Sequence, residues 1–207
     1  MKFGPISISV LAVLLALICF APAGYANILT PGTSGPPDLL TEGGTPVTGV
    51  LATPISTGTY TGTLYSQVDV ETGGNLDFLY ELVVATGPDA VNRLTVTNFT
   101  GYTTDVGDLG LGGIDPTSVD RSNSGGTIGF LFGNEPNGIT AGENSDVLII
   151  QTNAKTFGIG TGETIDGSVF QGGAYAPSPE PASVGLLLGG LFGIGLIVAR
   201  KFQARLS

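Results

Sequence analysis

The chain has 207 residues and a formal net charge of −10, with no histidine, no tryptophan and a single cysteine at position 19. This composition excludes Ser-His-Asp and Cys-His catalysis, and zinc sites built from histidine or from several cysteines. The negative charge argues against nucleic acid and anionic lipid surfaces as partners.

The first 26 residues have the features of a secretory signal peptide. Lys2 supplies a positive start, residues 6–20 form an apolar core, and Gly24-Tyr25-Ala26 places small residues at the spacing that a signal peptidase needs. We expect cleavage after Ala26, with a cut after Ala23 as the alternative. The only cysteine lies in the apolar core, so the mature chain is expected to contain none.

Residues 27–178 are long enough for a single domain and contain every acidic residue of the chain except Glu180. The first part of this segment, residues 27–46, is rich in proline and glycine, which break any helical or strand periodicity. We expect an irregular arm that lies along the domain. Disorder is the alternative, because few of the arm's side chains are apolar enough to be buried.

Beyond the arm, short runs of alternating apolar and polar residues predict β-strands. The strongest runs are Gly58–Val70 and Leu76–Ala85, which the turn Glu71–Asn75 joins into a hairpin. Gly62 is expected to form a bulge or a close backbone contact within the first of them. The other candidate strands are Val47–Leu51, Val91–Gly101, Thr127–Phe132, Asp146–Asn153 and Ser168–Gln171.

About seven strands without an amphipathic helix predict an all-β fold, an antiparallel β-sandwich over residues 47–171. Its architecture is expected to be jelly-roll or immunoglobulin-like, although the Cys-Trp-Cys signature of true immunoglobulin domains is absent. The run Gly158–Gly162 lacks the context of a phosphate-binding loop and is interpreted as a turn. Residues 172–178 are interpreted as a linker.

Between Tyr102 and Gly126 the alternation is lost, which indicates a long loop. Its aspartates are Asp105, Asp108, Asp115 and Asp120. Together with backbone carbonyls of the glycine-rich turns, these carboxylates offer the oxygen ligands that calcium prefers, although their spacing does not match the regular calcium-binding loop. Aspartates that stabilise turns are the simpler interpretation. No organic cofactor is expected.

The end of the chain, residues 179–207, has the pattern of a membrane span. After Pro179-Glu180-Pro181 comes an uncharged apolar run, residues 182–199, followed by the basic residues Arg200, Lys201 and Arg205. About eighteen residues that rise roughly 1.5 Å each just cross a hydrocarbon core of about 30 Å. Because basic residues favour the cytoplasmic side, we expect a transmembrane helix with a cytoplasmic C-terminus and the domain outside.

Three glycines, Gly185, Gly189 and Gly193, recur at four-residue spacing in this predicted helix. Such spacing gives one smooth ridge along which another helix, or a processing enzyme, can approach closely. Because glycine also weakens helices, a marginal span that is recognised and cut is the alternative interpretation.

The proline-flanked triplet at 179–181, the apolar run and the basic end together resemble the PEP-CTERM sorting signal of bacterial envelope proteins. The resemblance implies an exported protein that is processed by signal peptidase and by an exosortase-like enzyme. It also implies initial anchoring in the inner membrane through the C-terminal helix. Residues 92–107 and 148–154 are similar to parts of other PEP-CTERM cargo proteins, but this similarity assigns no role to any residue.

Two classes of function remain for the domain. The first, implied by the resemblance, is a non-catalytic envelope or extracellular-matrix protein with exopolysaccharide as a candidate partner. The second is a carbohydrate-binding module or a small hydrolase at the cell surface. The candidate side chains for the second class are Tyr65, Tyr102 and Tyr175 for stacking on sugars, and Asp77 and Glu81 as an acid–base pair. Strand alternation places the two carboxylates on a solvent-facing side rather than in a cleft, and no tryptophan is available for stacking, so the first class leads.

Overall fold

The computed structural model describes residues 28–133, 138–165 and 168–178. Within these ranges the chain forms two β-sheets and no α-helix, so the prediction of an all-β protein is confirmed. None of the described segments forms a helix that is long and apolar enough to cross a membrane. The predicted signal peptide with its cleavage site at Ala26 and the predicted tail at 179–207 lie outside the described residues.

The first sheet, called sheet A, has the strand order β2-β8-β11-β6-β5-β3, and β4 also pairs with β5. Its strands are β2 (Asp38–Leu39), β3 (Thr45–Pro46), β4 (Leu51–Ser56), β5 (Thr61–Val70), β6 (Leu76–Thr86), β8 (Thr104–Asp108) and β11 (Leu148–Thr152). The second sheet, called sheet B, has the order β1-β9-β10-β7-β12-β13. Its strands are β1 (Ser34–Gly35), β7 (Arg93–Thr97), β9 (Ser118–Arg121), β10 (Thr127–Leu131), β12 (Phe157–Ile165) and β13 (Val169–Pro177).

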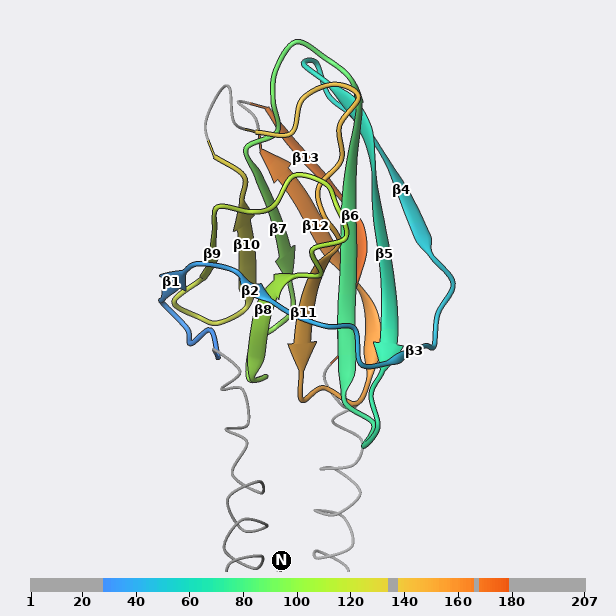
Figure 1. Ribbon diagram of the computed structural model, residues 1–207, viewed down its shortest axis with the longest axis vertical. Coiled ribbons are helices and arrows are strands. Elements are labelled where there is room, and N and C mark those ends of the chain that lie inside the picture. The colour runs from blue at the N-terminus through green and yellow to red at the C-terminus, as the bar shows by residue number, and fades with distance from the viewer. Residues whose placement is uncertain (1–27, 134–137, 166–167, 179–207) are drawn as a thin grey trace, which may run out of the picture.

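The two sheets lie face to face and enclose one hydrophobic core, which makes the fold a β-sandwich (Figure 1). Alternate residues of β5 and β6 point into this core, because successive side chains of a strand face opposite sides. The Phe78 ring on β6 meets the Phe99 ring, which follows β7, edge to face with centroids 5.7 Å apart. The Tyr80 hydroxyl donates a hydrogen bond of 2.7 Å to the Tyr175 carbonyl on β13, which ties the two sheets together.

The predicted hairpin is formed by β5 and β6, which pair from Val70↔Leu76 to Gly62↔Val84 with a shift of register between Thr61 and Gly62. A Cβ atom at Gly62 would lie only 2.2 Å from the Val83 carbonyl oxygen. The expectation of a bulge and close contact at Gly62 is therefore confirmed. The strand predicted at Val47–Leu51 lies further along the chain, because the segment that pairs with β5 is β4, Leu51–Ser56. Pro54 is tolerated in β4 because one edge of this strand is open.

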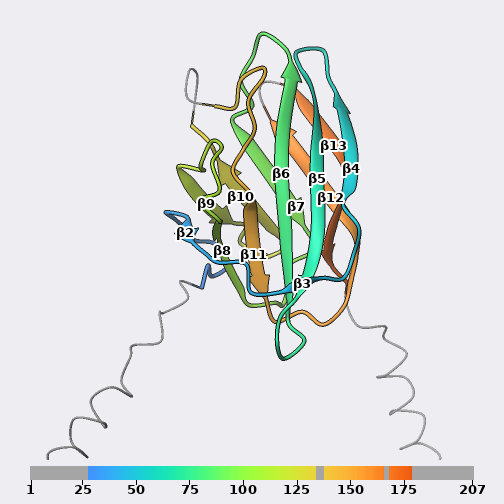
Figure 2. The same cartoon turned by 45° about the vertical axis from the view of Figure 1, so that its right-hand side comes forward.

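The N-terminal segment, residues 28–46, crosses the outer face of sheet A (Figure 2). Its strand β2 pairs in parallel with β8 near one side of the sheet, and its strand β3 pairs with β5 on the other. The part between them therefore passes over β11 and β6, where the Gln151 side-chain amide donates to the Thr41 carbonyl at 3.2 Å. We call residues 38–46 the arm segment.

The structure corrects three sequence-based interpretations in the second half of the domain. The expected loop from Tyr102 to Gly126 contains the strands β8 and β9, the expected turn at Gly158–Gly162 is part of β12, and the expected linker at 172–178 is largely part of β13. The inward faces of β12 and β13 carry small residues because the opposite sheet lies very close: a Cβ at Gly162 would meet Leu64 Cδ2 at 2.4 Å. Such strands show little apolar alternation, which is why the sequence pattern missed β12 and predicted only the start of β13, at Ser168–Gln171.

Candidate functional site

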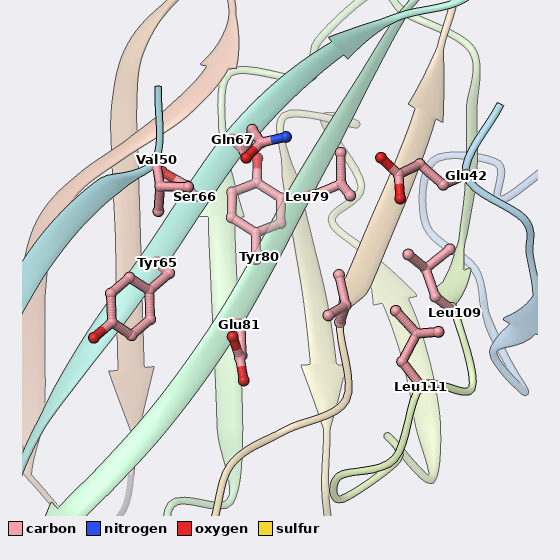
Figure 3. Close-up of a pocket in the computed structure, with 11 residues that line it drawn as sticks. Glu42, Val50, Tyr65, Ser66, Gln67, Leu79, Tyr80, Glu81, Leu109 and Leu111 are labelled. Atoms are coloured by element: carbon pink, nitrogen blue, oxygen red, sulfur yellow. The ribbon is translucent and has the colours of Figure 1, made fainter. Parts of the chain in front are cut away.

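An open groove of about 330 Å³ lies on the outer face of sheet A beside the arm segment. Figure 3 shows Tyr65 and Glu42 on opposite sides of the groove, with Leu79 between them. The residues that line the groove are Glu42, Val50, Tyr65, Ser66, Gln67, Leu79, Tyr80, Glu81, Leu109, Leu111 and Val147. They come from β5 and β6, from the arm, and from the segments next to β4, β8 and β11, so the site exists only in the folded chain.

The register of β5 and β6 places the polar side chains of the groove. Tyr65 pairs with Glu81 and Gln67 pairs with Leu79, and all four belong to the side of each strand that faces away from the core. The Glu81 carboxylate accepts a hydrogen bond of 3.1 Å from the Asn144 side-chain amide, which fixes its position. Leu79 forms an apolar floor between these polar groups, and Leu111, which is 69% exposed, forms part of the wall.

Of the three tyrosines that were candidates for sugar stacking, only Tyr65 lines the groove. The Tyr102 hydroxyl donates to the Ser178 carbonyl at 3.0 Å. The Tyr175 ring packs edge to face against Phe157 with centroids 5.9 Å apart. Tyr102 and Tyr175 therefore have structural partners elsewhere in the domain.

Asp77 and Glu81 do share one side of β6, but the expectation that both face solvent is wrong for Asp77, which is fully buried. The pKa of Asp77 is raised to about 7. Burial is the largest cause, and the carboxylates of Glu71, Asp69 and Glu42 add to it. Residues four apart on a strand are separated by about 13 Å. A glycosidase pair needs about 5–10 Å, so these two carboxylates do not have the geometry of an acid and base on one glycosidic bond.

A cluster of three carboxylates, Asp108, Asp115 and Asp146, lies behind the Leu109–Leu111 wall of the groove. One oxygen from each lies within 4.8 Å of the others. The pKa of Asp108 is raised by burial and then by the Asp115 carboxylate. Backbone N–H groups hold two members in place: Gly110 donates to Asp108 at 3.2 Å, and Gly112 donates to Asp146 at 2.8 Å.

The four aspartates expected to share a calcium ion therefore do not come together. Asp120 lies on sheet B, where it accepts a hydrogen bond of 2.7 Å from Arg93 in a salt bridge. Asp105 faces Asp38 of the arm segment instead. Asp108 and Asp115 do meet, but their third member, Asp146, was missed, because only the pairing of β11 with β8 brings it there. An oxygen-only donor set of this kind suits a hard cation such as calcium.

The groove thus combines one aromatic ring, an apolar floor, a primary amide and two carboxylates, which are the groups that stack on and hydrogen-bond a polar organic ligand. The basic residues Arg200, Lys201 and Arg205 of the predicted tail lie outside the described residues, as do its glycine ridge and its proline-flanked triplet. Comparisons of the chain with protein-family models, with curated proteins and with solved structures found no match.

Proposed function

We propose that the protein is an exported, non-catalytic protein of the cell envelope or extracellular matrix, and that its groove on sheet A contacts an exopolysaccharide. The observation that carries this proposal is the groove itself, with the Tyr65 ring and the polar groups of Gln67 and Glu81 around an apolar floor. A sugar ring presents an apolar face for stacking and hydroxyl groups for hydrogen bonds, and this groove offers both kinds of contact.

The charge of the groove narrows the class of glycan. Its rim carries the carboxylates of Glu42 and Glu81, and among the described residues no basic side chain lines it. An anionic polysaccharide would be repelled by these groups. We therefore propose a neutral glycan, or one that carries amino groups, as the ligand.

A small hydrolase at the cell surface is the second candidate, and the structure gives it less support. The carboxylates on β6 are too far apart for an acid–base pair, and Asp77 is enclosed rather than open to a substrate. A binding role needs no such pair, which favours the non-catalytic proposal.

The sandwich is proposed to be of the jelly-roll type rather than immunoglobulin-like. In a jelly roll a long hairpin is rolled up, so that successive nested strand pairs fall in opposite sheets. Here β6 pairs with β11 in sheet A, and the next nested pair, β7 with β10, lies in sheet B. This order supports the jelly-roll assignment.

The tail remains the basis for the proposed location. We propose that signal peptidase cuts after Ala26 and that the C-terminal helix anchors the chain in the inner membrane, with Arg200, Lys201 and Arg205 on the cytoplasmic side. An exosortase-like enzyme then recognises the triplet at 179–181. The support for this order of events is the amino-acid pattern of the two ends of the chain.

The glycan proposal is tested by measuring binding to the full-length protein in detergent by isothermal titration calorimetry. The ligands are neutral polysaccharide from native cells and alginate as an anionic comparison. We expect binding of the neutral glycan only, and a loss of about tenfold in affinity for Tyr65→Ala, because a stacked ring is removed. Ile159→Ala, which removes an exposed apolar side chain from sheet B, is the matched control and should bind normally. Equal binding by both variants would contradict the groove as the site.

A further inference from the structure

Beneath the arm segment, a row of acidic side chains crosses the outer face of sheet A. The strand registers align Asp69 of β5 with Asp77 of β6, Asp77 with Gln151 of β11, and Gln151 with Asp105 of β8. These four residues therefore form one continuous row, which we call the carboxylate row. Its three aspartates are at most 6% exposed.

The arm segment brings two more acidic side chains onto this row. The Glu42 side chain faces the Asp69 side chain, and the Asp38 side chain faces that of Asp105, so that the pKa values of Glu42 and Asp105 are raised. The arm backbone lies very close to the sheet here, since a Cβ at Gly44 would be 2.9 Å from Asp69 Cβ. The start and the middle of the arm segment thus each place a carboxyl group against a carboxyl group of the sheet.

Such contacts require protons. Asp69 Oδ2, both carboxylate oxygens of Asp77 and both of Asp105 are buried without a hydrogen bond of good geometry. Weaker contacts from the Gln151 side chain to Asp77 and from the Val106 backbone to Asp105 favour the ionised forms, but the pKa of each aspartate is still raised. Two carboxyl groups form a hydrogen bond only when one of them is protonated and donates, and two ionised groups at this distance repel each other. The closed arrangement is therefore the arrangement of the protonated state.

The neighbouring charges do not offset this repulsion. The charged groups around Asp77 are Glu71, Asp69 and Glu42, all acidic, and the one around Asp105 is Asp38. The basic residues of the described ranges are engaged elsewhere: Arg93 with Asp120, Arg121 with backbone carbonyls, and Lys155 with the Gly73 carbonyl and Asn75 Oδ1 in the turn after β5.

We propose that the arm segment is a pH-operated clasp: protons shared between its two acidic residues and the carboxylate row hold it on sheet A, and loss of those protons to solvent releases it. Because Glu42 of the arm segment also lines the groove, release removes part of one wall of that site. The clasp itself rests on the acidic contacts and not on any ligand of the groove.

The direction of the pH dependence follows from the folded-state pKa values. Burial and neighbouring carboxylates raise the pKa of Asp77 to about 7 and that of Asp105 to about 6, and the hydrogen bond with Asp69 raises the pKa of Glu42. The closed state therefore binds more protons than the released state, in which these groups ionise near pH 4. Closure is favoured below about pH 4 and is lost progressively as the pH rises toward 7.

Hydrogen exchange of backbone amides in the full-length protein tests the clasp. The Leu40 N–H donates to the Asp108 carbonyl at 2.9 Å and reports closure, while the Val91 N–H, bonded to the Ile139 carbonyl at 2.9 Å, reports the rest of the sandwich. After correction for intrinsic exchange rates, we expect the protection of Leu40 to fall at least tenfold from pH 5 to pH 8. Protection of Val91 should change by less than twofold.

Neutral variants identify the groups responsible. The double variant Asp38→Asn with Glu42→Gln keeps donors toward the row at every pH, so the pH dependence of its Leu40 protection should be weaker than in the unsubstituted protein, with the remainder due to the buried aspartates of the row. Asp77→Asn, which removes the central charge, should reduce the pH dependence by itself. Glu163→Gln on β12 removes one acidic charge from the other sheet and is the control that should leave it unchanged.

Several results would overturn the proposal. Leu40 protection that does not change with pH would show that the clasp does not open. A pH dependence as large in the double variant as in the unsubstituted protein would assign it to other groups. Loss of protection at pH 5 on addition of EDTA would show that a divalent cation, and not protons, holds the arm segment.

Discussion

Arg121 at the end of β9 connects several separate backbone segments. Its guanidinium donates hydrogen bonds of 2.8–3.0 Å to the carbonyls of Leu29, Phe99, Tyr102 and Gly125. It also donates to Thr104 Oγ1 at 3.1 Å. Burial lowers the pKa of Arg121, but an arginine remains charged in proteins. In the structure, Arg121 holds loops and the N-terminal segment together.

We therefore expect Arg121→Met to destabilise the protein by about 3 kcal/mol or more, because it leaves buried carbonyls without donors. Urea denaturation followed by circular dichroism gives the free energy of unfolding. Arg93→Met is the control, since it breaks a partly exposed salt bridge that contributes about 1 kcal/mol or less. Similar losses in the two variants would show that Arg121 has no special role.

At the scale of elements, the segment between β8 and β9 shows how a loop can acquire a site from a distant strand. Asp108 ends β8 and Asp115 follows in the connection, while Asp146 comes from just before β11. Asp115 is exposed and the other two are buried, so a cation would be held from one side by the sheet and from the other by the loop.

The calcium hypothesis now depends on these three aspartates and predicts a metal effect on stability. Calcium at one hundred times its dissociation constant would stabilise the fold by about 2.7 kcal/mol, and the melting temperature should rise. Asp115→Asn should remove most of that rise, and in EDTA it should stabilise slightly, because it relieves repulsion between carboxylates.

Differential scanning calorimetry in calcium and in EDTA checks both effects. Asp120→Asn provides the comparison, because Asp120 was part of the predicted ligand set but lies on sheet B. A melting temperature of the unsubstituted protein that calcium leaves unchanged would count against the site.

Strand content was only partly predictable at this scale. Alternation identified the strands that face a core of large side chains, such as β5, β6 and β10, because most inward positions there are apolar. It missed β12, whose inward positions are mainly glycine, since the close approach of the opposite sheet leaves no room for larger residues. The long pairing of β12 with β13 depends on backbone hydrogen bonds that local periodicity does not reveal.

At the scale of the whole molecule, the proposed proteolytic processing of both ends predicts the length of the mature chain. We expect the protein recovered from native cells to begin at Asn27 and to end near Pro179-Glu180-Pro181. A permanent anchor needs neither a proline-flanked acidic triplet nor a span that is so short and rich in glycine.

Intact-mass spectrometry of the protein from native cells decides between processing and retention. A simple single-span anchor would give a chain that runs from Asn27 through Ser207. Replacement of Glu180 by Ala is the informative variant: a processing enzyme that recognises the triplet would leave this chain uncut, while signal-peptide removal at Ala26 would proceed as before.

The sequence by itself determined the all-β class, the β5–β6 hairpin and the bulge at Gly62, because strand alternation and glycine geometry act between neighbouring residues. It also determined which catalytic chemistries are excluded, since these depend on composition alone. Only the tertiary structure decided which acidic residues meet. Asp146 joins Asp108 and Asp115, and Asp77 is buried beneath the arm segment, because strands that are far apart in the chain pair side by side and one segment crosses over them. Those contacts arise from long-range pairing, and no local pattern of residues encodes them.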